Sequence, residues 1–169
     1  MEYFPSVLDR QQSDELADRV EAYFVKNGFG LWAVEIPGVT SFAGFDGLFT
    51  PTFEAPGNQP IEIGWRLARP FWGKGYATEG ARAALQFGFT HLDLEEIVAF
   101  AVPANVRSTA VMRRIGMTFS QEFDHTKFEE GHRLRRHVLY RIGREEWRRS
   151  VLEKAGDGER PAGQQAGQG

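Results

Sequence analysis

Hydrophobic positions near the start of the chain recur at the spacing of an α-helix and then change to the alternation of β-strands. Four apolar residues fall on one helical face: Leu16, Val20, Tyr23 and Phe24. We predict that this helix begins at Ser13, whose hydroxyl can cap it. We expect it to end in the usual left-handed way at Gly28.

Later parts of the chain have the character of strands. The predicted strands are residues 31–36, 41–49, 61–67, 97–102, 119–123 and 137–142. The first two flank Pro37-Gly38 and predict a hairpin. The third alternates, with its apolar side chains on one face and Glu62 and Arg66 on the other. Residues 50–60 are rich in proline and predict a loop.

Two further stretches have helical character, residues 77–92 and a second one that starts at Asn105 and ends at Gly116. The order strand, turn, helix, strand, helix is typical of α/β units, whereas the flanking strands have an antiparallel style. We therefore predict a mixed α/β fold: a mostly antiparallel central sheet with helices on both faces. Residues 1–154 form one domain in this interpretation, and residues 155–169, with little apolar content, form a disordered tail.

Composition narrows the class of protein. The net charge of −3 gives no overall attraction to nucleic acid or to anionic membranes. The absence of cysteine excludes disulfides, thiolate catalysis and cysteine-ligated metals. The N-terminus lacks a signal-peptide pattern, and no apolar run approaches the ~20 residues of a membrane helix. We expect a soluble, cytoplasmic protein.

The segment from Trp72 to Glu79 lies between a predicted strand and a predicted helix. Gly73 and Gly75 leave backbone N–H groups bare at the positive end of the helix dipole, which is an anion site of the kind that phosphates occupy. A tight turn that needs glycine for geometry alone is the competing interpretation. The segment is neither a Walker A loop nor a dinucleotide fingerprint, because the required Ser or Thr and the third glycine are absent.

Asn105 and Ser108 form a second group of interest, directly after the predicted strand 97–102. Asn105 is a good helix N-cap, and this alone explains the pair. A functional role requires the glycine turn to lie nearby, and ligands do favour crevices between neighbouring strand–helix junctions.

Together these segments resemble the GNAT superfamily, and most closely its N-terminal acetyltransferases of ribosomal proteins. The resemblance extends from about residue 30 to 141. It is carried by these segments: Ile61 to Leu67, Trp72 to Glu79, Val102 to Asn105 with Ser108, and Ile115 to Met117. It implies a GNAT-like fold and acetyl-coenzyme A as the acyl donor, with an amine as the acceptor.

The resemblance also assigns residues. The cofactor-binding residues that it implies are Leu67, Ala68, Arg69, Trp72, Gly73, Lys74, Gly75, Tyr76, Ala77, Thr78, Asn105 and Ser108. In the family, the glycine turn binds the pyrophosphate, and the pantetheine arm pairs with the backbone near residues 67–69 in a gap between splayed strands. A backbone N–H near Arg66 or Leu67 stabilises the thioester oxygen.

The implied reaction is direct attack of the amine on the thioester in a ternary complex. A protein α-amine has an ordinary pKa of about 8, against about 10.4 for lysine, so an α-amine needs little help from a base. Glu62 is the candidate base, directly or through water, although a solvated strand carboxylate is the plain alternative. Ser108 is the candidate proton donor to the departing thiolate, and a protein N-terminus is the preferred acceptor.

Two alternatives remain open at this point: a small-molecule amine N-acetyltransferase, and a non-catalytic GNAT-like module that binds acyl-coenzyme A. Two features depart from the family. Trp72 stands where many members carry Gln or Arg. The chain also begins at what resembles the family's second helix, so we expect the first strand and helix to be missing, which leaves a sheet edge exposed and a homodimer open.

Other clusters give little sign of function. The spacing of His125, His132 and His137 matches no common zinc pattern, so we expect no metal. Either of the first two could line the acceptor site. The arginines between residues 133 and 149 lack interleaved aromatic residues for stacking on bases, so we expect a solvated surface and no nucleic-acid partner.

Overall fold

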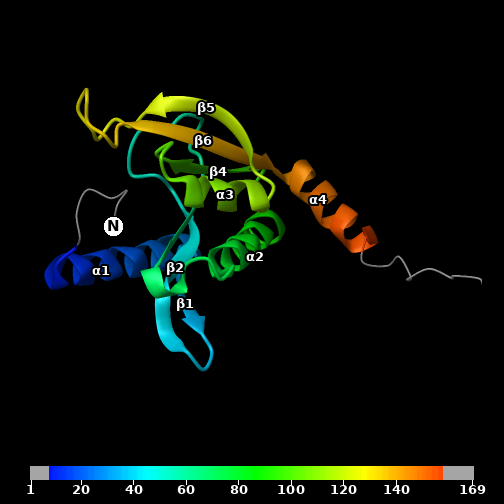
Figure 1. Cartoon of the computed structure of the whole chain (residues 1–169), viewed down its shortest axis with the longest axis horizontal. Coiled ribbons are helices and arrows are strands. Elements are labelled where there is room, and N and C mark those ends of the chain that lie inside the picture. The colour runs from blue at the N-terminus through cyan, green and yellow to red at the C-terminus, as the bar shows by residue number, and fades with distance from the viewer. Residues whose placement is uncertain (1–7, 158–169) are drawn as a thin grey trace, which may run out of the picture.

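The computed structural model describes residues 8–157 and has one central six-stranded sheet with helices around it (Figure 1). The elements in chain order are α1 (Arg10–Asn27), β1 (Leu31–Ile36), β2 (Thr40–Phe49), β3 (Glu62–Leu67), a short 3-10 helix η1 (Arg69–Phe71), α2 (Tyr76–Thr90), β4 (Glu96–Ala101), α3 (Val106–Arg114), β5 (Thr118–Asp124), β6 (Arg136–Gly143) and α4 (Arg144–Asp157). The predicted strands and helices are all present, with ends that differ by a few residues.

The start of α1 differs from the prediction. Asp9, not Ser13, is the N-cap: its carboxylate accepts from the Gln12 backbone N–H at 2.8 Å. The Gln12 side-chain oxygen accepts in return from the Asp9 N–H at 3.0 Å. This reciprocal capping box satisfies two end groups at once, whereas a cap at Ser13 would leave a turn of the helix unformed. The predicted left-handed end at Gly28 is confirmed.

The C-terminal boundary also differs, because α4 continues through Asp157. The predicted tail, residues 155–169, therefore overlaps the end of this helix, and residues 158–169 lie outside the described part. Several contacts attach the start of α4 to the domain, and two of them illustrate this. The Arg144 N–H donates to the Glu95 carbonyl at 2.9 Å, and the Trp147 ring lies 5.3 Å from that of Phe89.

The sheet has the strand order β1-β2-β3-β4-β6-β5. Its pairs are antiparallel except for β3 and β4, which are parallel and connected through α2. The mixed, mostly antiparallel sheet is therefore confirmed. Pairing between β3 and β4 is limited to one residue pair, Glu62 with Val98, where the Val98 N–H donates to the Ile61 carbonyl at 3.0 Å. Beyond Glu62 the two strands part.

The main core lies between the sheet and the helices α2 and α3. Its most buried members include Leu48, Ile63, Leu85, Ile97, Met112 and Ile142. A smaller cluster of Ile36, Ala43 and Leu67 packs beneath the segment that leads into α2. The apolar face predicted for the third strand is confirmed, because Ile63 and Leu67 are both buried. Glu62 and Arg66 consequently point to the opposite face of the sheet.

Helix α1 packs less deeply than α2 and α3. It has no fully buried residue, and its predicted apolar face is only half-buried. In the view of Figure 1, α1 lies on one side of β1 and β2, and α2 lies on the other. Within residues 8–157, no helix combines the length and the apolar character needed to cross a bilayer.

Candidate functional site

A cavity of about 280 Å³ lies where β3 and β4 part. Its lining residues come from several elements: Leu31, Phe45, Phe49, Phe53, Glu62, Ile63, Gly64, Trp65, Arg66, Phe100, Ala101, Val102, Asn105, Ser108, Met112, His125 and His137. Residues from both faces of the sheet line this one space. The opening between the two strands therefore connects the face that carries Glu62 with the face covered by α3.

The backbone of β3 has an open edge toward this cavity. Alternate residues of a strand bond to each neighbour. The Ala68 N–H donates to the Ala43 carbonyl on the β2 side at 2.8 Å, and the Ile61 carbonyl accepts on the β4 side. By this alternation, the backbone groups of Trp65 and Leu67 face the side where β4 has moved away. The predicted gap between splayed strands is present in the structure.

Glu62 has an unusual environment for a strand glutamate. It is half-buried, pairs across the sheet with Phe49 and lines the cavity. Burial raises the pKa of its carboxyl from 4.5 to about 8, because the low-dielectric surroundings disfavour the charge. The interpretation of Glu62 as a solvated surface carboxylate is therefore wrong. A carboxyl with this pKa is mostly protonated at neutral pH.

Asn105 and Ser108 lie at the start of α3 and line the same cavity as Glu62. Asn105 is the N-cap of α3, and its side-chain oxygen accepts from the Ser108 backbone N–H at 3.2 Å. The capping role read from the sequence is thus confirmed, and it uses the oxygen of Asn105. The Ser108 side chain is half-buried at the cavity wall.

The turn before α2 is open to solvent from Trp72 through Gly75. Gly73 and Gly75 have φ angles of 73° and 91°, and a Cβ atom at either position would meet nothing within 4 Å. In the described part of the chain, no backbone carbonyl accepts from the N–H groups of Lys74, Gly75, Tyr76 or Ala77. The first helical N–H groups with an acceptor are those of Thr78 and Glu79, both bonded to the Gly75 carbonyl.

This geometry fits a diphosphate. The bare N–H groups lie at the N-terminus of a 15-residue helix, where the helix dipole favours anions, and the Lys74 side chain adds a cation beside them.

Trp72 links this turn to the end of β3. Its indole N–H donates to the Leu67 carbonyl at 2.7 Å, and the Arg107 guanidinium lies 5.1 Å from the centre of its ring. The sequence predicted that an acyl arm pairs with the backbone at residues 67–69. In the structure the Leu67 carbonyl and the Ala68 N–H already have protein partners. Arg69 lies in η1 and is exposed.

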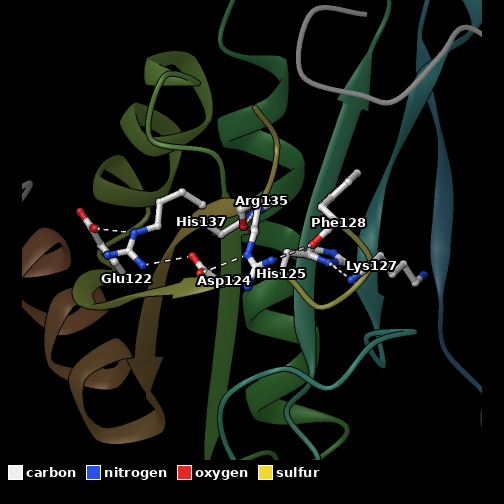
Figure 2. A network of polar contacts seen from close by, with 8 residues as sticks. Glu122, Asp124, His125, Lys127, Phe128, Arg135 and His137 are labelled. Atoms are coloured by element: carbon white, nitrogen blue, oxygen red, sulfur yellow. Dashed lines mark hydrogen bonds and ion pairs between the residues drawn. The ribbon is translucent and has the colours of Figure 1, made fainter. Parts of the chain in front are cut away.

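The cavity also contains residues whose positions the sequence did not reveal. His125 directly follows β5, and His137 lies in β6, with their rings 5.0 Å apart (Figure 2). The Phe53 ring, from the loop 50–60, stacks on His125 at 3.8 Å. The sequence suggested that His125 could line an acceptor site, and it does line the cavity. His132 is not among the lining residues.

The predicted site residues thus fall into two groups along β3. Glu62, Asn105 and Ser108 share the cavity at one end. Trp72 to Thr78 form the turn and the first residues of α2 beyond the other end, and Leu67 connects the two groups through its bond with Trp72. Among residues 8–157, no three His, Asp or Glu side chains come together as a metal site would require.

A larger hollow of about 660 Å³ lies between α3 and β5 and includes Thr109, Arg113, Phe119 and Tyr140. It contains none of the predicted site residues. The Arg113 guanidinium donates to the Tyr140 hydroxyl at 2.9 Å. We therefore place the site in the smaller cavity, which has the shifted carboxyl and lies at the strand opening.

Comparisons with known proteins identify the family of the chain. The sequence model of the Acetyltransferase (GNAT) domain matches residues 1–118. The chain is 34% identical over 122 residues to the uncharacterized protein YkkB of Bacillus subtilis, covering 72% of this chain and 69% of that protein. It is 36% identical over 135 residues to the FsC-acetyl coenzyme A-N(2)-transacetylase of Aspergillus fumigatus, covering 69% of this chain and 55% of that protein. A GNAT-family acetyltransferase from Bacillus anthracis superposes with a TM-score of 0.69 at 26% identity, covering 86% of this chain and 81% of the other.

Proposed function

The chain belongs to the GNAT acetyltransferase family, whose members transfer an acetyl group from acetyl-coenzyme A to an amine, and we propose that its acceptor is an α-amine that gives its proton to Glu62. The observation that carries this proposal is the position of the Glu62 carboxyl in the cavity at the strand opening, where burial raises its pKa to about 8. In a protein acceptor, this α-amine is the N-terminus.

The donor side of the proposal rests on the turn and the opening. Backbone N–H groups from Lys74 to Ala77 bind the pyrophosphate, and the acyl arm enters between β3 and β4 beside Trp65. The Leu67 N–H faces this gap by strand alternation and is suited to stabilise the thioester oxygen. The bound coenzyme supplies an activated acyl carbon, and the protein supplies position.

The match of pKa values favours an α-amine over a lysine side chain. The ordinary pKa of an α-amine is about 8, close to that of Glu62, so proton transfer between them is nearly thermoneutral. For a lysine amine at about 10.4 the same transfer is uphill by roughly 3 kcal/mol, at 1.36 kcal/mol per pKa unit. Glu62 is therefore an efficient base for the first kind of amine and a poor one for the second.

In the proposed step, the nitrogen lone pair forms the C–N bond while the C–S bond breaks. The proton leaves the amine for the Glu62 carboxylate, and the sulfur takes up a proton as it departs. Ser108 is the proposed donor of that proton, directly or by relaying one from solvent, because it lines the same cavity as Glu62. The departing group leaves as a free thiol.

Thiol release with glycine amide as the acceptor tests the proposal. We expect kcat/KM to rise with pH up to about 8, as both Glu62 and the amine lose protons. Glu62→Gln is expected to lower the rate by about 10²-fold or more. Glu35→Gln, a change at an exposed glutamate of β1, is the matched control and should keep the wild-type rate.

Nα-acetyl-lysine amide, which offers only an ε-amine, is the comparison acceptor. We expect glycine amide to react faster at pH 7.5. A faster reaction of the lysine compound, or wild-type rates in Glu62→Gln, would contradict the assigned acceptor or the assigned base respectively.

A further inference from the structure

Aromatic rings form the outer wall of the Glu62 cavity. Four phenylalanines line it: Phe45, Phe49, Phe53 and Phe100. Phe53 contacts both another phenylalanine and a histidine of this lining. Its ring lies 3.8 Å from His125 in a near-parallel stack and 5.6 Å from Phe100 edge-on. The two histidines continue the wall, with His137 lying 5.0 Å from His125.

The loop that carries Phe53 is fixed at several points. The Thr50 N–H donates to the Tyr23 hydroxyl of α1 at 3.0 Å. Lys127, from the turn between β5 and β6, donates through Nζ to the Thr52 hydroxyl at 2.6 Å. Contacts from α1, β4 and the β5–β6 turn thus hold one half-buried aromatic ring at the cavity. A surface that is held in this way is suited to select what enters.

The charges in the cavity oppose a second positive group on the acceptor. Glu62 is the one carboxyl in the lining, and Arg66 brings a cation whose guanidinium lies 5.6 Å from the Phe45 ring. Burial lowers the pKa of His125 to about 4 and also lowers that of His137, so both imidazoles are neutral at pH 7. A cavity lined by neutral rings and one carboxyl suits an acceptor that has one amine attached to an uncharged group.

The acidic side chains just outside the cavity do not change this balance. Asp124 precedes His125, and its carboxylate pairs with Arg135 at 3.2 Å and with Arg136 at 3.1 Å. Glu122 pairs with Arg136 at 2.9 Å. Figure 2 shows the Asp124 carboxylate directed toward Arg135. Because these carboxylates are paired with arginines, they do not attract the other charges of a polyamine toward Glu62 along this edge.

We propose that the acceptor carries an uncharged apolar group, preferably an aromatic ring, on the carbon next to its amine, and that Phe53 selects it by packing against that group. This inference rests on the proposed function, because it places the amine at Glu62. The cavity of about 280 Å³ is near the lower end of ligand pockets, which suits one side chain of amino-acid size. Apolar burial of a ring against Phe53 supplies the preference.

The test compares kcat/KM for three α-amines: L-phenylalanine amide, glycine amide and L-lysine amide, with spermidine as a polycation. We expect the wild-type protein to prefer phenylalanine amide over glycine amide by at least about 10-fold, and to react least well with the lysine amide and spermidine. Phe53→Ala should lower kcat/KM for phenylalanine amide about 10-fold and change that for glycine amide by less than about twofold.

Two further variants complete the design. Phe42→Ala removes a ring of β2 that is 61% exposed and lies outside the cavity lining, and it should leave the preference intact. Phe53→Leu keeps much of the apolar volume and should retain part of the preference for phenylalanine amide over glycine amide. This variant serves as the test if Phe53→Ala does not fold.

The outcomes separate the two proposals. Acetylation of glycine amide with no preference for phenylalanine amide, or an unchanged preference in Phe53→Ala, overturns the selection by Phe53 and leaves the proposed function standing. A preference for spermidine or for the lysine amide overturns the inferred acceptor class. Failure to acetylate any of these amines overturns the proposed function and this inference with it.

Discussion

The buried carboxyl of Glu62 makes folding stability depend on pH in a way that can be measured without any substrate. Its pKa is 4.5 in the unfolded chain and about 8 in the folded protein. Between these values the folded state holds a proton that the unfolded state has released. Stability therefore falls as the pH rises from about 4.5 to 8, by up to 1.36 kcal/mol per pH unit.

Over this window of roughly 3.5 pH units the cost reaches at most about 5 kcal/mol. Glu62→Gln keeps the shape and the polarity of the side chain but cannot ionise. The variant is expected to match the wild type near pH 5 and to exceed it increasingly toward pH 8.5. For a chain of this length, 1 kcal/mol corresponds to roughly 2–4 °C in Tm, so the gap should widen by several degrees and by no more than about 20 °C.

Thermal unfolding followed by circular dichroism, at half-unit steps from pH 5 to 8.5, measures this gap. Glu35→Gln, at an exposed site of β1, is the control and should run parallel to the wild type. The Asp46 carboxyl, whose pKa burial raises to about 6, adds the same dependence to all three proteins and cancels in the comparison. Parallel curves for Glu62→Gln and the wild type would refute the burial of a shifted carboxyl.

Three further predictions concern the glycine turn, the packing of α2 on β2 and the attachment of α4. Gly73→Val places a β-branched residue at a φ of 73°, and we expect a KM for acetyl-coenzyme A at least about 10-fold higher; an unchanged KM would show that the turn does not hold the coenzyme. Gly80→Ala brings a methyl group into the Asp46 carboxyl and should lower the free energy of unfolding, measured in urea, by about 1–3 kcal/mol. The double variant with Asp46→Ala should recover most of this loss, and additive losses would contradict the collision. The Arg144 side chain is only 11% exposed and donates to the Leu94 carbonyl at 2.8 Å. Arg144→Ala should lower the free energy of unfolding by about 2 kcal/mol, against less than about 0.5 kcal/mol for Arg148→Ala at an exposed position. Equal losses would contradict the anchoring role of Arg144.

Local patterns were enough to predict the framework of the site. The alternation in residues 61–67 placed Glu62 on the face opposite Ile63 and Leu67, because side chains of a strand alternate whatever the strand packs against. The glycines at 73 and 75 predicted a sharp turn before a helix, and the structure has that turn, with positive φ angles at both glycines. Asn105 was identified as a cap from its position alone.

The aromatic wall could not be predicted in the same way. Phe53 meets His125 only because the loop 50–60 and the end of β5 come together across the sheet. No local sequence pattern predicts that contact, since the two residues are far apart in the chain. The raised pKa of Glu62 depends on the same enclosure, so the sequence could name the residue but not its electrostatic state. The cap at Asp9 was missed because both Ser13 and Asp9 have acceptable cap chemistry, and only the return bond from Gln12 distinguishes them.

A crystal structure of this chain with bound coenzyme A is the most direct test of the central claim. We predict that the diphosphate binds the N–H groups of residues 74–77 and that the pantetheine arm lies between β3 and β4, with its sulfur in the cavity that Glu62 and Ser108 line. An arm that lies outside the strand opening, or a diphosphate bound away from the glycine turn, would contradict it.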